Sequence, residues 1–258
     1  YYGFAETGQF SLAFDLGLRA VQAIGSALDV LLFQIAVAAH EKHGLDRAKE
    51  QIARNITIVL AIIVPACVGV ALTLPSVEAL VVPMQYRGPF GQYLTLMLPG
   101  LFALTMINFA INPIFQIQKK TLPLIAAAVI GCAGTPLLVA FLPRGADASS
   151  LAIAQSGAYC AALIALVCFA FASRPRLPSL REMGAITLAT AAMVAALWPM
   201  RSWTPGALTL AAQIVIGAGV FGALALAFDI AGLRAPVLAR IRALAHRNGG
   251  EAEAIGKS

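Results

Sequence analysis

Residues 11–29 read SLAFDLGLRAVQAIGSALD, and this stretch decides both the fold class and the candidate site. Polar side chains recur in it at spacings of four, four, three, four and three residues: Ser11, Asp15, Arg19, Gln22, Ser26 and Asp29. At 3.6 residues per turn, these six positions, the polar stripe, fall within about 80° of one helix face. The remaining faces carry mainly leucine, isoleucine, valine and phenylalanine. In a membrane protein, such a helix is typical of the lining of a hydrophilic cavity.

The composition of the whole chain indicates that its solvent is a lipid bilayer. Hydrophobic residues make up 60% of the 258 residues and charged residues only 12%, whereas a soluble domain has about 25% charged residues. The mean hydropathy is +0.83. The sequence therefore predicts an all-α integral membrane protein.

Apolar segments long enough to span the hydrocarbon core, about 20 residues each, divide the chain into a series of transmembrane helices. The segments lie at residues 9–38, 56–82, 92–116, 122–142, 150–172, 183–200 and 207–230. We therefore expect a bundle of about seven transmembrane helices.

The basic residues are distributed unequally between the two sides of this bundle. The connections near 39–55, 117–121 and 173–182 and the C-terminal tail hold 14 lysines and arginines, whereas the opposite connections hold three. By the positive-inside rule, the first set of connections and the C-terminus are cytoplasmic. The net charge of +6 then reflects topology and contact with anionic head groups, and it does not indicate a nucleic-acid partner.

The chain opens with Tyr1, Tyr2 and Gly3, without an initiator methionine or a signal-peptide pattern. An odd number of spans places this end on the outer side. We expect the chain to be part of a longer protein whose N-terminal half is not included in this sequence.

The residues that usually carry catalysis or bind metals form no recognisable motif. The four cysteines lie apart in three predicted spans without CxxC spacing, so a zinc or redox site is not expected. The three histidines lie in polar segments outside the spans. The outer connections, near 83–91, 143–149 and 201–206, are too short to hold a large glycan donor. We expect neither an enzyme nor a bound cofactor.

Two spacings of opposite charges predict ion pairs along a helix. Asp15 and Arg19 are four residues apart within the polar stripe, so they could neutralise one another inside a helix bundle or bind a substrate. Glu50 and Arg54 have the same spacing in the connector 39–55 and could pair along a short surface helix.

A second polar face lies in the third span, where Thr105, Asn108, Asn112 and Gln116 follow helical spacing. Buried amides in a membrane often join helices by hydrogen bonds. For Asn108 and Asn112, helix–helix hydrogen bonding and cavity lining are equally good interpretations.

The order of these features resembles the polysaccharide-biosynthesis flippases of the MOP superfamily, the Wzx-like group that includes O-antigen flippases. The resemblance covers most of residues 1–175 and rests on several short patterns: Gly8 to Ala13 (GQFSLA), Asp46 to Glu50 in a charged connector, Pro65, Pro83 to Arg87, Asn108, Asn112, Lys119 and Lys120. Phe10 stands where the family usually has tyrosine, and Gln85 to Arg87 replaces a commoner Gly-x-x-Tyr pattern.

This resemblance implies a fold, a location and an activity. The family has 14 helices in two pseudo-symmetric bundles with two additional helices. It moves lipid-linked oligosaccharides across the bacterial inner membrane by alternating access, for surface polysaccharides such as lipopolysaccharide. The chain would then be the C-terminal half. Residues 1–175 would form a lobe, 176–230 two additional helices, and 231–258 a basic cytoplasmic tail.

The same resemblance assigns roles to the polar stripe. Arg19, the basic residue deepest in a predicted span, would contact the substrate phosphate, and Asp15 would position Arg19 or exchange with the substrate. Sugar hydroxyls would be bound by the remaining polar side chains of the stripe: Gln22, Ser26 and Asp29.

Two alternatives remain. A MATE-type multidrug antiporter would couple cation flow to export, but it would be expected to use intramembrane acids without a balancing arginine. An enzyme or assembly subunit of an envelope-glycan pathway is disfavoured by the short outer connections.

Overall fold

The computed structural model describes residues 3–142, 148–172 and 176–235, and in these ranges the secondary structure is entirely helical. The α-helices, with one π-helical segment (η2) between α3 and α4, are α1 (Phe4–His43), α2 (Leu45–Val81), α3 (Pro89–Met106), η2 (Ile107–Ile111), α4 (Asn112–Ile117), α5 (Leu122–Phe141), α6 (Ser149–Ala172), α7 (Leu180–Leu197) and α8 (Ala207–Ala227). Short 3-10 turns complete the described chain: η1 (Met84–Tyr86), η3 (Trp198–Ser202) and η4 (Ile230–Gly232).

Six helical segments within the described residues are long and apolar enough to cross a membrane, and they coincide with the last six predicted spans. They are Lys49–Val81, Pro89–Ile117, Leu122–Phe141, Ser149–Phe171, Leu180–Ser202 and Ala207–Ala227. The first predicted span corresponds to α1, which is 40 residues long and is not among these six segments. The predicted all-α membrane fold is thus confirmed.

The connector expected at 39–55 is almost entirely helical. α1 continues to His43, and α2 begins at Leu45. Gly44 between them has φ of +81°, a conformation that only glycine adopts without strain. A single glycine therefore reverses the chain where a longer polar connection was predicted.

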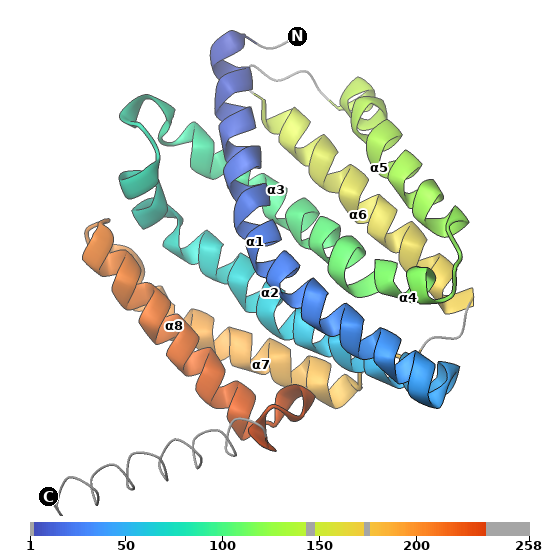
Figure 1. Ribbon diagram of the computed structural model, residues 1–258. Helices are drawn as coiled ribbons and strands as arrows, with labels where there is room; N and C mark the ends of the chain where they lie inside the picture. Colours follow the sequence, from blue (N-terminus) through green and yellow to red (C-terminus); the bar gives the residue numbers. More distant parts are fainter. Residues whose placement is uncertain (1–2, 143–147, 173–175, 236–258) are drawn as a thin grey trace, which may run out of the picture.

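The helices pack in a consistent order across the bundle. α1 lies over α3 and α2, α6 packs between α3 and α5, and α7 and α8 pack against α2 on the opposite side (Figure 1). The turn at Gly44, the turn before α5, the segment before α7 and η4 lie at one end, which we call the Gly44 end. η1 and η3 lie at the other end, the Pro83 end.

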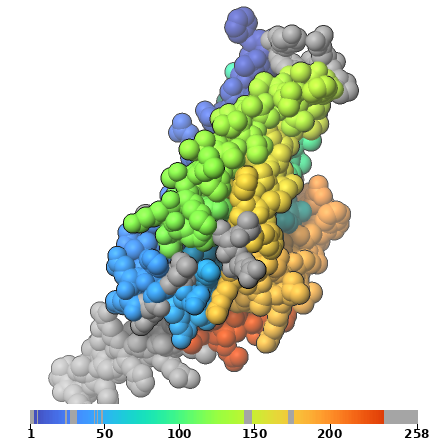
Figure 2. All heavy atoms as spheres, turned by 90° about the vertical axis from the view of Figure 1, so that its right-hand side faces the viewer, coloured from blue at the N-terminus to red at the C-terminus, as the bar shows by residue number. Residues whose placement is uncertain are grey.

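α5 and α6 cover one face of the bundle (Figure 2). α5 buries only Ala127 and Gly131 within the chain, although it is apolar over its whole circumference. Its exposed side chains are large and hydrophobic: Leu122, Ile125, Val129, Leu137 and Phe141. A helix of this kind requires lipid or another protein as its surroundings.

Candidate functional site

The candidate site lies on α1, whose two faces have opposite environments. One face is buried against the bundle and consists largely of small and apolar residues: Phe10, Ala13, Gly17, Gly25, Leu32 and Ala36. The other face is exposed and carries five residues of the polar stripe: Ser11, Asp15, Arg19, Gln22 and Ser26. The side chain of the sixth, Asp29, lies outside the described residues. The described part of the stripe therefore lies on the face of α1 that is not packed against the bundle.

Two glycines explain why α1 is held in this rotation. A Cβ atom at Gly17 would lie 2.7 Å from the Cδ1 atoms of both Leu94 and Leu101 on α3. At Gly25, it would clash with the ring of Phe109 in η2. Larger side chains at either position would push α1 away from α3, so the two glycines allow the close approach that turns the polar stripe outward.

The described hydrogen bonds between α1 and other helices lie beyond the two ends of the polar stripe. Asn55 of α2, itself buried, donates its amide Nδ2–H to the carbonyl oxygen of Leu32 at 2.7 Å. Near the other end, the hydroxyl of Tyr93 donates to the carboxylate of Glu6. These contacts attach α1 to α2 and α3, and both lie outside the polar stripe.

Within the stripe, the described side chains make few hydrogen bonds or ion pairs with the rest of the described chain. No ion pair joins Asp15 and Arg19, although both side chains are described. Ser26 Oγ donates to the carbonyl oxygen of Ala23 at 3.4 Å. The self-neutralised pair considered from the sequence is thus not formed in this structure, and both charges remain available to a ligand.

Asn108 and Asn112 lie where the third span departs from regular α-helix. Residues 107–111 form a π-helix, and Asn112 begins α4 immediately before Pro113. Proline has no N–H to donate to the carbonyl four residues earlier, and π-helical turns are frequent at functional sites. Both asparagines are half-buried, and neither side chain makes a hydrogen bond to another described residue. Cavity lining therefore remains a prediction for them.

The sequence interpretation missed the glycines on the buried face of α1. Their signal was present, because Gly17 and Gly25 are eight residues apart and therefore lie on a common helix face outside the stripe. Metal binding has no candidate in the described ranges, which contain no group of three or more histidine, cysteine or acidic residues placed to hold an ion.

Comparison with known proteins gives a structural likeness without a sequence match. No protein-family model matches the chain, and no curated protein sequence matches it. The structure is similar to that of a chain described as "Lipid II flippase MurJ, inward closed conformation", with a TM-score of 0.62 at 17% sequence identity. The match covers 83% of this chain and 46% of that chain. The chain thus has the fold of part of that flippase and spans less than half its length.

Proposed function

We propose that the chain forms one lobe of a transporter that flips a lipid-linked oligosaccharide across a bacterial inner membrane. The observation that carries this proposal is the exposed polar face of α1, in a bundle whose other long helices are strongly apolar. The likeness to a lipid II flippase supports it. O-antigen or another surface polysaccharide as the transported glycan follows from the sequence resemblance alone.

The chemistry of such a substrate matches the polar stripe. A lipid-linked oligosaccharide carries a phosphate or pyrophosphate between its sugars and its hydrocarbon tail. Arg19 offers planar N–H donors that can bind phosphate oxygens in pairs. Asp15 lies one helical turn away and makes no ion pair with Arg19 in this structure, and its proposed role is to position the guanidinium when phosphate is bound. Gln22 and Ser26 would bind sugar hydroxyls, and Asp29 is proposed for the same role.

The exposed face also requires a partner, because charged side chains facing lipid are costly. We propose that this partner is the N-terminal half of the same protein, so that the stripe faces a hydrated cavity between two lobes. Asn108 and Asn112 are proposed to line the same cavity.

The arrangement of the chain in the membrane is also proposed. Nine basic residues of the described chain gather at the Gly44 end: Lys42, Arg47, Lys49, Arg54, Lys119, Lys120, Arg176, Arg181 and Arg234. We propose that this end and the C-terminus face the cytoplasm. We further propose that residues 1–175 form the lobe, 176–230 two additional helices, and 231–258 a basic cytoplasmic tail.

Thiol accessibility tests the proposal directly. In the full-length protein without its four native cysteines, single cysteines would replace Asp15, Arg19, Gln22 or Ser26. Controls on the same turns would replace the half-buried Phe14, Leu18 or Val21. We expect a membrane-impermeant maleimide to label the first set and spare the second. Protection of all seven positions would contradict a water-filled path along α1.

A further inference from the structure

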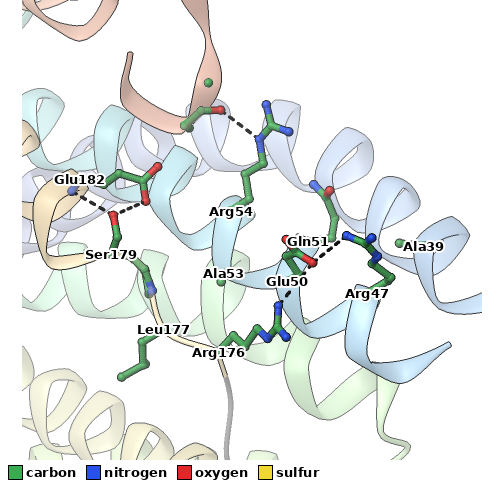
Figure 3. Close-up of a pocket in the computed structure, with 13 residues that line it drawn as sticks. Ala39, Arg47, Glu50, Gln51, Ala53, Arg54, Arg176, Leu177, Ser179 and Glu182 are labelled. Atoms are coloured by element: carbon green, nitrogen blue, oxygen red, sulfur yellow. Dashed lines mark hydrogen bonds and ion pairs between the residues drawn. The ribbon is translucent and has the colours of Figure 1, made fainter. Parts of the chain in front are cut away.

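A second polar site lies at the Gly44 end, remote from the polar stripe. Four segments of the chain surround a hollow of about 840 Å³, which we call the basic pocket: α1, the first turns of α2, the segment 176–182 before and within α7, and η4. Three arginines line it, Arg47, Arg54 and Arg176, together with Glu50 and Glu182. Figure 3 shows Arg47 and Arg176 meeting at Glu50 from two sides, with Arg54 reaching toward η4.

The described contacts leave most of the arginine donors of this pocket unused. Arg47 Nη1 and Arg176 Nη1 lie 3.1 and 3.4 Å from the same atom, Glu50 Oε2. Arg54 donates its Nε–H to the carbonyl oxygen of Ala231 at 3.0 Å. Within the described residues, each guanidinium thus engages one of its three nitrogens, although each has five N–H donors.

The charges of the pocket are also unbalanced. Glu182 is occupied elsewhere, because its Oε2 accepts from the hydroxyls of Ser179 and Thr57 at 2.9 and 3.4 Å. Among the described residues, one oxygen of Glu50 is thus the carboxylate contact of both Arg47 and Arg176. Three arginines against two carboxylates leave one positive charge in the pocket, which suits a ligand with one negative charge and several acceptor oxygens.

The surroundings of the pocket indicate where such a ligand comes from. Leu177 lines the pocket and is 57% exposed, and Leu180, at the start of α7, is 87% exposed. The candidate membrane span of α7 begins at Leu180. Exposed leucines beside arginines at the start of a span mark a boundary between lipid and water, where basic pockets between helices bind anionic head groups.

We propose that the basic pocket binds the phosphate of an anionic membrane phospholipid. Arg47 and Arg176 contact the phosphate oxygens, and Glu50 is the internal anion that the phosphate displaces. Leu177 and Pro178 contact the glycerol and the first carbons of the acyl chains. This site does not depend on the proposed function, because a lipid bound here would stabilise the Gly44 end whatever the protein transports.

Native mass spectrometry of the detergent-purified full-length protein tests this assignment, with phosphatidylglycerol, phosphatidylcholine and inorganic phosphate as separate ligands. We expect phosphatidylglycerol to bind more tightly than phosphatidylcholine, and equimolar inorganic phosphate not to displace it. The double variant Arg47→Gln/Arg176→Gln should weaken phosphatidylglycerol binding about tenfold or more, since each basic residue near a membrane surface contributes about 1 kcal/mol.

Two further variants make the test specific. The matched control Lys119→Gln/Lys120→Gln removes the same charge from the same end outside the pocket and should change the affinity less than about threefold. Glu50→Gln removes the competing carboxylate and should tighten binding. Equal affinities of the two double variants, weaker binding by Glu50→Gln, or no preference between the two lipids would overturn the proposal. Displacement by equimolar inorganic phosphate would overturn the assignment to a lipid.

Discussion

Gly25 of α1 lies against the aromatic ring of Phe109, so α1 and the π-helical segment η2 meet without space for a methyl group at position 25. Gly25→Ala should therefore destabilise the protein by about 1–3 kcal/mol, as overpacking does elsewhere. The measurement is the thermal midpoint in detergent. Gly69→Ala on α2 is the matched control, because a Cβ there meets nothing within 4 Å, and it should be neutral or stabilising.

The same contact predicts a specific rescue. Phe109→Ala removes the ring that a methyl group at position 25 would meet. The double variant Gly25→Ala/Phe109→Ala should lose less stability than the sum of the two single variants, by about 1 kcal/mol or more in a double-mutant cycle. Strict additivity would contradict direct packing of these two residues.

The contact at Gly100 is stiffer than the contact between Gly25 and Phe109. A Cβ at Gly100 of α3 would lie 2.6 Å from the Cα of Ser156 on α6, whose hydroxyl accepts the Gly100 N–H at 2.8 Å. At Gly17, by contrast, the obstructing atoms are the flexible ends of two leucines. Gly100→Ala should therefore lower the thermal midpoint more than Gly17→Ala, because backbone cannot move aside as a side chain can. The reverse ranking would mean that α3 and α6 separate easily.

Glu78 supplies a prediction at the Pro83 end. Its Oε1 accepts from the backbone N–H groups of Gly88 and Gly91 at 3.3 and 2.7 Å, so a carboxylate caps the first turn of α3. Glu78→Ala should cost about 1 kcal/mol of stability, since it removes both the acceptor and a negative charge at a helix N-terminus. Chemical denaturation is the measurement, and Glu41→Ala, at an exposed position on α1, is the control. Equal losses for the two variants would exclude a capping role.

The sequence predicts the helices of this protein better than the contacts between them. Spans are recognisable because each requires about 20 apolar residues, whatever its neighbours are. Glu50 shows the limit: its spacing predicted a pair with Arg54, but Arg54 donates to Ala231, 177 residues away. Glu50 instead pairs with Arg47 and Arg176. Helical periodicity describes one helix at a time, and a partner from a distant helix changes which local pair forms.

For the candidate site too, the sequence predicted features of one helix but not its contacts with other helices. Periodicity placed the polar side chains of α1 on one face, and the structure exposes that face. Periodicity could not indicate that Gly17 and Gly25 fix the rotation of α1, because that rotation depends on Leu94 and Leu101 of α3 and on Phe109 of η2. The π-helix before Pro113 is likewise visible only in the backbone of the structure.

Arg19 carries the sharpest functional prediction, because its guanidinium is exposed and has no ion-pair partner among the described residues. In the full-length protein reconstituted with a lipid-linked oligosaccharide, Arg19→Gln should lower the rate of translocation about tenfold or more, since a charge-assisted hydrogen bond contributes about 1.5–3 kcal/mol. Arg19→Lys should recover part of the rate, because lysine keeps the charge without the paired donors. Arg201→Gln is the matched control: this arginine lies over the ring of Trp198 at the Pro83 end, away from the stripe. Translocation is measured as the fraction of oligosaccharide that becomes accessible to a membrane-impermeant lectin. Equal rates for Arg19→Gln and Arg201→Gln would remove Arg19 from the transport path, and the polar stripe would then need another explanation.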